Sequence, residues 1–168
     1  MNELKPINQQ KLFGLEKHFL ELIRLFNNNI YPSKLLLSGL KGIGKSTLAY
    51  HFINYILSEN EDFKYNLNSF EINPNSSIFK TILNKSNGNL IIVDVNPDKK
   101  FIDINQIREL INNLNKSSFN NKPRFVLIDN IELLNINSIN ALLKILEEPN
   151  DNIYFILINN NKRIHSTL

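Results

Sequence analysis

The sequence predicts an α/β fold in which a parallel sheet is covered by helices on both faces. Short, near-continuous runs of Leu, Ile, Val and Phe recur along the chain, as the strands of a buried parallel sheet require. Segments with apolar residues at helical spacing separate these runs, and parallel strands need such crossovers between them. A glycine-rich loop joins the first run to a helical segment, a connection that suits phosphate binding.

Length and composition fit one globular domain, which we assign to residues 1–168. Of the 168 residues, 42% are hydrophobic and 21% are charged, and the formal net charge is +3. The Lys and Arg residues are scattered, so charge alone does not predict a nucleic-acid-binding surface. The absence of cysteine excludes disulfides and thiolate metal sites, and we expect no zinc. No signal-peptide pattern occurs and no apolar run approaches the roughly 20 residues of a membrane span, which predicts a cytoplasmic protein without a membrane partner.

The first part of the chain contains a predicted helix, a strand and a second helix. Apolar residues recur at helical spacing within Leu12–Phe26, and an Asn-rich break follows. The run "KLLLS", Lys34–Ser38, is bounded by Pro32 and Gly39, as a short buried strand should be. Beyond the glycine loop, the spacing predicts an amphipathic helix within Leu48–Ile56.

The middle of the chain is less regular. Ser58–Asn89 is polar and weakly periodic, so we expect an irregular connection with room for a short helix at Ile78–Leu83. The run "LIIVDV", Leu90–Val95, predicts a second buried strand.

The remaining elements alternate between helix and strand. Asp103 is a predicted N-cap, and Gln106, three residues later, completes a capping box. The apolar run Arg124–Asp129 predicts a third strand. A helix follows over Asn137–Pro149, where the proline should stop it. The run "IYFILI", Ile153–Ile158, predicts the fourth strand.

The stretch "SGLKGIGKST", Ser38–Thr47, contains the GxxxxGKS spacing of a phosphate-binding loop. Glycines let successive backbone N–H groups turn inward around an anion, and the N-terminus of the following helix favours negative charge. Lys45 is predicted to reach the β- and γ-phosphates, and the Ser46 hydroxyl to bind Mg²⁺. A purely structural strand-to-helix turn is the alternative. The predicted nucleotide-binding residues of the loop are Gly39, Gly42, Ile43, Gly44, Lys45, Ser46 and Thr47.

The second half of such a site is predicted at the ends of later strands. Asp129 should bind Mg²⁺ with Ser46, because an acidic residue after an apolar strand holds the metal in such sites. Hydrolytic enzymes with a "DE" pair use the Glu to polarise the attacking water, but Asn130 follows here. A carboxamide cannot take a proton from water, so we expect weak hydrolysis and assign no catalytic base; Glu132 is the alternative. Asn159 is the predicted contact to the γ-phosphate, with an Asn-rich turn as the other interpretation.

The segments "LLLSGLKGIGKSTLAYHF" and "RFVLIDNIELLNINSINALLKILEEPNDNIYFILINN" resemble the AAA+ clamp-loader family. The most specific piece is "NALLKILEEP", Asn140–Pro149, which looks like the helix that clamp-loader subunits carry after the Mg²⁺-binding strand. The resemblance covers most of Leu12–Leu168. It implies a P-loop NTPase of the AAA+ type, with a RecA-like parallel β-sheet flanked by helices.

Within that family the chain looks most like the delta-prime subunits of bacterial DNA polymerase III. Asn130 replaces the Glu of the DE pair, the cysteines of a small zinc module found in many relatives are absent, and Phe101–Asn130 resembles the delta-prime run with a helix before the acidic strand. Leu40 departs from the usual Pro, which should loosen the loop slightly. The family's arginine-finger motif, Ser-Arg-Cys, would lie just beyond Leu168. We therefore assign no arginine finger and expect a domain truncated before its last strand and lid, with lid and collar domains absent.

The resemblance implies a subunit that binds ATP or ADP with Mg²⁺ and hydrolyses little. Its expected partners are the delta and tau/gamma clamp-loader subunits in a hetero-oligomeric ring, the sliding clamp, and primed DNA through the assembled complex. One alternative is an active tau/gamma-like motor or another AAA+ DNA-processing ATPase. Another is a P-loop kinase or regulator outside replication, against which the "NALLKILEEP" helix argues.

Overall fold

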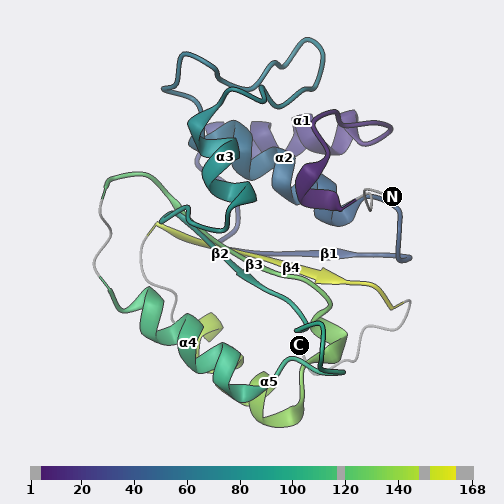
Figure 1. Cartoon of the computed structure of the whole chain (residues 1–168), viewed down its shortest axis with the longest axis vertical. Coiled ribbons are helices and arrows are strands. Elements are labelled where there is room, and N and C mark those ends of the chain that lie inside the picture. The colour runs from purple at the N-terminus through teal and green to yellow at the C-terminus, as the bar shows by residue number, and fades with distance from the viewer. Residues whose placement is uncertain (1–4, 117–119, 148–151, 162–168) are drawn as a thin grey trace. The chain divides into compact units, whose positions relative to one another are not determined.

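The computed structural model describes residues 5–116, 120–147 and 152–161 (Figure 1). The chain divides into two compact units, each built from two segments: residues 1–32 with 44–87, and residues 33–43 with 88–168. Helices make up the regular structure of the first unit, and the second contains the sheet. The chain crosses between the units after residues 32, 43 and 87.

The sheet of the second unit has four parallel strands in the order β1-β4-β3-β2. Its strands are β1 (Lys34–Ser38), β2 (Leu90–Val93), β3 (Arg124–Ile128) and β4 (Ile153–Asn159). All four predicted strands are present, and every pairing is parallel. The α/β class with a parallel sheet, expected from the apolar runs, is confirmed.

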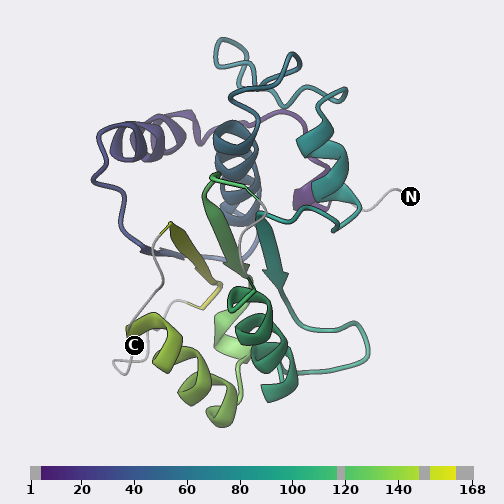
Figure 2. The ribbon, with the colours of Figure 1, turned by 90° about the vertical axis from the view of Figure 1, so that its left-hand side faces the viewer.

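Two helices of the second unit, α4 (Ile104–Leu114) and α5 (Ile136–Glu147), lie side by side on one face of the sheet (Figure 2). The capping box at the start of α4 is confirmed: Asp103 Oδ1 accepts from Gln106 N at 3.2 Å, and Gln106 Oε1 accepts from Asp103 N at 3.2 Å. Buried apolar side chains join the helices to the sheet, and each fully buried one contributes about 1.5–3 kcal/mol. They include Val93, Ile107, Leu110, Val126, Ile128, Leu142, Leu146, Phe155 and Leu157.

Three strand ends differ from the prediction by one or two residues, and one of them is that of β3, which ends at Ile128 and not at Asp129. β2 ends at Val93, not Val95, because the carboxylate of Asp94 accepts the N–H of Val95 at 2.7 Å and turns the chain out of the sheet. β4 extends to Asn159, which pairs with Ser38 of β1. Asp94 therefore follows a strand instead of lying within one.

From residue 5 onward, the first unit contains three helices, α1 (Glu16–Asn27), α2 (Lys45–Leu57) and α3 (Ser77–Leu83), and a 3₁₀ turn, η1 (Pro6–Asn8). α2 contacts each of the other three elements. Aromatic rings dominate the interior, with centroid separations of 5.0–6.5 Å that suit edge and stacked pairs. These rings belong to Phe19, Phe26, Tyr31, His51, Phe52, Tyr55, Tyr65 and Phe70.

Helix boundaries in the first unit follow local backbone chemistry. α1 begins at Glu16 and not at Leu12, because Gly14 is left-handed (φ 72°) and its N–H donates to Glu16 Oε1 at 3.0 Å. The short helix expected near Ile78–Leu83 is confirmed as α3, with Ser76 as its N-cap. In the second unit, the predicted stop of α5 at Pro149 lies outside the described residues.

His51, on α2, is fully buried and bonded at both ring nitrogens. Its Nε2 lies 3.1 Å from Gln9 O and its Nδ1 2.8 Å from Tyr65 Oη. A carbonyl can only accept, so Nε2 carries the proton and the Tyr65 hydroxyl donates to Nδ1. Burial lowers the pKa of His51 to about 4, against a smaller upward effect of the Gln9 carbonyl. Burial also raises the pKa of Tyr65.

Arg124, the first residue of β3, closes the C-terminal end of α4. The last carbonyls of a helix have no intrahelical donor and carry partial negative charge, so a guanidinium both satisfies and neutralises them. The side chain donates to the carbonyl oxygens of Asn113 (2.8 Å), Lys116 (3.1 Å) and Leu114 (3.2 Å).

Mild acid should destabilise the chain through His51. Its folded pKa of about 4 lies below the ordinary 6.5, so the unfolded chain binds the proton first. The contribution of His51 to the free energy of unfolding is therefore present above pH 6.5 and is lost as the pH drops toward 4. The loss is about 2 kcal/mol between pH 7 and pH 5. Urea unfolding at the two pH values measures this loss. His51→Gln should remove it, whereas His18→Gln, at an exposed site on α1, should retain it; equal pH dependence in both variants would contradict the assignment.

Replacing Arg124 by Lys should loosen the junction between β3 and α4. One ammonium cannot span three carbonyls, so we expect a loss of about 1–2 kcal/mol and a fall in Tm of about 3–6 °C. Thermal unfolding followed by circular dichroism measures the change. Arg108→Lys, at an exposed position on the same helix, is the matched control and should leave Tm within about 1 °C. A similar Tm for both variants would show that the cap contributes nothing.

Candidate functional site

The carboxyl ends of the four strands form one polar edge of the second unit. Because the strands are parallel, the residues that follow them meet at the same edge. Gly39 follows β1, Asp94 follows β2, Asp129 follows β3 and Asn160 follows β4. This is the edge at which open α/β sheets bind ligands.

The first half of the glycine loop leaves this edge directly from β1. Gly39 N donates to Asn159 O at 3.2 Å, which extends the β1–β4 ladder by one bond. Gly39 has φ 155°, and a Cβ there would lie 2.9 Å from Ile43 Cδ1. Gly42 is left-handed, with φ 87°. The predicted need for glycine at both positions agrees with the backbone.

The second half of the loop belongs to the first unit and begins α2. Gly44 is the N-cap, left-handed with φ 91°, and no side chain caps it. A Cβ at Gly44 would lie 2.9 Å from Leu15 Cδ1, so glycine is needed there on two grounds. Lys45, Ser46 and Thr47 form the first turn of α2, whose N–H groups have no acceptor within the helix itself. Lys45 is 8% exposed.

Asp129 is half-buried at the end of β3. Its N–H donates to Val93 O at 2.9 Å, which keeps it in register with β2. Its Oδ1 accepts from Asn130 N at 2.8 Å, and Asn160 Nδ2 lies at 3.5 Å. The carboxylate is thus oriented by the chain that immediately follows it.

Asn130 links the ends of three strands. Its Nδ2 donates to Asp94 Oδ1 at 2.8 Å, and its Oδ1 accepts from Asn160 Nδ2 at 2.8 Å. Its backbone is left-handed (φ 57°, ψ 48°), a conformation that Asn tolerates better than most residues. We call Asp94, Asn130 and Asn160 the edge triad.

Glu132 and Asn159 also form specific contacts at this edge. Glu132 lies in the 3₁₀ turn η2 (Ile131–Leu133), and its Oε2 accepts from Asn160 N at 3.1 Å. Asn159 is 5% exposed, and its Oδ1 accepts from Asn161 N at 3.0 Å, as in an Asn turn. No described residue accepts from Asn159 Nδ2, so the donor needed to contact a phosphate is not used within that part of the chain.

Gly39, Asp129 and Asn159 lie at the same edge of the sheet, together with two residues that sequence reasoning missed. Asp94 was missed because it was counted inside the second strand, although a charged residue after an apolar run is itself an end signal. Asn160 was missed because nothing in an Asn-rich stretch distinguishes it from Asn161. Lys45, Ser46 and Thr47 stand in the other unit.

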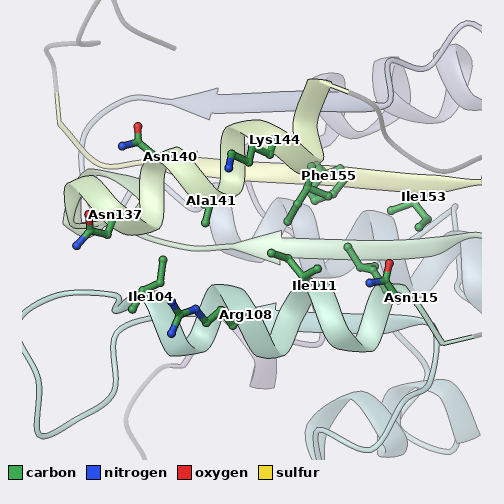
Figure 3. A pocket seen from close by; sticks show the side chains of 12 residues that line it. Ile104, Arg108, Ile111, Asn115, Asn137, Asn140, Ala141, Lys144, Ile153 and Phe155 are labelled. Atoms are coloured by element: carbon green, nitrogen blue, oxygen red, sulfur yellow. The ribbon is translucent and has the colours of Figure 1, made fainter.

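The face of the sheet that carries α4 and α5 contains a separate groove (Figure 3). Its volume is about 800 Å³, and Arg108 on α4 and Lys144 on α5 are its charged lining residues. It contains none of the predicted nucleotide-binding residues. The lining is completed by Ile104, Ile111, Leu114, Asn115, Asn137, Asn140, Ala141, Ile145, Ile153 and Phe155.

The described residues contain neither a cluster of metal ligands nor a membrane-spanning helix. In residues 5–116, 120–147 and 152–161, no three or more His, Asp or Glu side chains are grouped to hold a metal. Over the same ranges, no helix has both the length and the apolar character needed to cross a membrane.

A protein family and several individual proteins are similar to this chain over most or part of its length. A family model described as DNA polymerase III, delta subunit, matches residues 14–167. A DNA polymerase III subunit gamma/tau of Mycoplasma genitalium is 29% identical over 152 residues, which cover 90% of this chain and 24% of that protein. A DNA polymerase III subunit delta' of Buchnera aphidicola subsp. Baizongia pistaciae is 43% identical over 60 residues, 36% of this chain and 18% of that protein. The chain thus spans about a quarter or less of these relatives.

A solved structure supports the fold. A DNA polymerase III gamma subunit-related protein from Thermotoga maritima matches with a TM-score of 0.53 and 18% sequence identity, over 82% of this chain and 39% of that chain. At this identity the similarity concerns the fold alone. It agrees with a parallel sheet flanked by helices.

Glu132 should act as a structural acceptor for the loop after β4. Glu132→Ala removes the partner of Asn160 N and should cost about 1 kcal/mol, or about 2–4 °C in Tm. Glu132→Gln keeps an oxygen acceptor and should stay within about 0.5 kcal/mol of the parent. Thermal and urea unfolding measure both, with Glu109→Ala on the exposed face of α4 as control. Equal stability of the Ala and Gln variants would refute the role.

Proposed function

Because this chain belongs to the DNA polymerase III delta subunit family, a family of clamp-loader subunits, and is delta-prime-like, we propose that it is the nucleotide-binding module of a delta-prime subunit. In this role it binds ATP or ADP with Mg²⁺, hydrolyses it slowly, and contributes mainly structure to the clamp loader. The observation that carries the proposal is the glycine loop, whose Gly42 and Gly44 have the left-handed backbone that a phosphate cradle requires.

The residues present fit Mg²⁺-nucleotide by their chemistry. Backbone N–H groups from Gly42 to Thr47 would receive phosphate oxygens, and the Lys45 ammonium would add charge-assisted bonds. Ser46 and Asp129 would hold Mg²⁺, which when bound neutralises phosphate charge. Asn159 Nδ2 would donate to the terminal phosphate.

The bonding at the polar edge supports the proposal of slow hydrolysis. Asn130 stands where a water-activating Glu would follow Asp129, and both polar atoms of its side chain are already bonded, to Asp94 and Asn160. Glu132, the alternative base, accepts the N–H of Asn160. Each candidate is therefore engaged by protein groups, and we assign neither as a catalytic residue.

The proposed setting is the bacterial cytoplasm, in a ring with delta and tau/gamma subunits. The proposed task of the ring is to open the sliding clamp and close it around primed DNA. The names of the two relatives support this setting, since one is a gamma/tau and the other a delta' subunit of DNA polymerase III.

The second candidate function is a tau/gamma-like motor, which the match to the gamma/tau subunit favours. The two functions differ in whether Glu132 activates water. Single-turnover assays with the partner subunits present should show the same slow hydrolysis for the parent and for Glu132→Gln. Loss of a fast turnover in the Gln variant would favour the motor.

Replacing Lys45 by Met should weaken ATP binding while keeping the apolar stem of this buried side chain. Loss of charge-assisted bonds to phosphate predicts a Kd about 10- to 100-fold higher. Titration of a fluorescent ATP analogue with Mg²⁺ measures the change. Lys41→Met, at an exposed position in the same loop, is the control and should bind within about twofold of the parent. Equal affinities for the two variants, or no binding by the parent chain, would refute the nucleotide site.

A further inference from the structure

Position 130 in the edge triad uses one side-chain donor and one side-chain acceptor, and the carboxamide of Asn130 supplies both. The ionised carboxylate of Asp94 can accept hydrogen bonds but cannot donate them, so the atom of Asn130 that faces it must be the Nδ2 donor. The other end of the same carboxamide then presents Oδ1 to the Nδ2 of Asn160. A carboxylate at position 130 could accept from Asn160 but could not donate to Asp94.

The backbone at position 130 serves the same arrangement. Asn130 is left-handed, and its N–H donates to Asp129 Oδ1 at 2.8 Å. The side chain anchors that turn to β2 through Asp94 and to β4 through Asn160, and Asn160 is itself held by Glu132. Asn130 therefore contacts Asp129 through one main-chain bond, and its two side-chain bonds to Asp94 and Asn160 fix the turn that carries this N–H.

We propose that Asn130 is a positioning residue: its carboxamide joins the ends of β2, β3 and β4 and thereby holds the Asp129 carboxylate in place to bind Mg²⁺. Asn130, which stands where a water-activating Glu would follow Asp129, is thus a required part of the site. The metal-binding half of this inference rests on the proposed function; the joining of the strand ends does not.

The test exchanges donor and acceptor across the Asp94–Asn130 bond. Asn130→Asp is nearly isosteric, but at neutral pH it sets two carboxylates 2.8 Å apart without a proton between them. Asp94→Asn alone keeps an oxygen acceptor for Asn130 Nδ2. The double variant, N130D/D94N, restores the bond with its polarity reversed, because the carboxamide introduced at position 94 would donate to the carboxylate introduced at position 130. That carboxylate still accepts from Asn160. Asn96→Asp, in an exposed loop, controls for the added charge.

Thermal unfolding of the full chain at pH 7.5 should show the Tm of Asn130→Asp lowered by about 5 °C. The double variant, Asp94→Asn and Asn96→Asp should each lie within about 2 °C of the parent. At pH 5 the deficit of Asn130→Asp should shrink by about half relative to the parent at the same pH, because one of two adjacent carboxyls takes up a proton and donates to the other. A deficit that the second substitution does not rescue, or that pH does not change, overturns the joining role.

The positioning role is tested by how much Mg²⁺ tightens ATP binding, measured as the ratio of Kd in EDTA to Kd in Mg²⁺. Asn130→Asp should reduce this ratio about tenfold, and the double variant should restore it to within about threefold of the parent. An unchanged or larger ratio in Asn130→Asp overturns the positioning role even if its Tm falls. A parent chain that binds no ATP overturns the proposed function and this role with it, while the pH-dependent Tm rescue still decides whether the strand ends are joined.

Discussion

Parallel pairing of the four strands is the constraint on which the rest of the second unit depends. Gly39 and Asn160 lie far apart in the sequence, yet they meet because β1 and β4 run in the same direction and pair through Asn159. The same alignment places Asp94 and Asp129 beside them. A single antiparallel strand would send its terminal polar residue to the opposite edge. Parallel strands in turn need connections that cross over the sheet, which the segments containing α4 and α5 provide.

Amide groups of the chain donate hydrogen bonds to the carboxylates of the polar edge. Three carboxylates, those of Asp94, Asp129 and Glu132, each accept hydrogen bonds from backbone or side-chain amides. An arginine or lysine there could pair with these carboxylates but could not also accept, and it would compete with Mg²⁺ for Asp129. Asn is the side chain that offers a donor and an acceptor together at short reach. The Asn-rich composition of this chain thus has a structural use at this edge.

Sequence reasoning predicted the features that depend on residues close together in the chain, and it missed those that depend on residues far apart in the chain. The strands and the Asp103–Gln106 capping box were predicted, because apolar runs and a three-residue spacing are local signals. The left-handed Gly42 and Gly44 were expected from the loop motif. The Arg124 cap on α4 and the edge triad were not predicted, because each joins residues that only the folded sheet brings together. The division into two units likewise leaves no mark in composition.

Each end of β3 is connected to a different part of the second unit. Arg124, the first residue of β3, donates to a carbonyl oxygen in the last turn of α4, and Asp129 follows the last residue of the strand. The strand itself includes neither glycine nor proline, and neighbouring strands flank it on both sides. The five residues of β3 thus connect the capped end of α4 to the carboxylate that follows the strand, so the helix cap and the polar edge share one structural element.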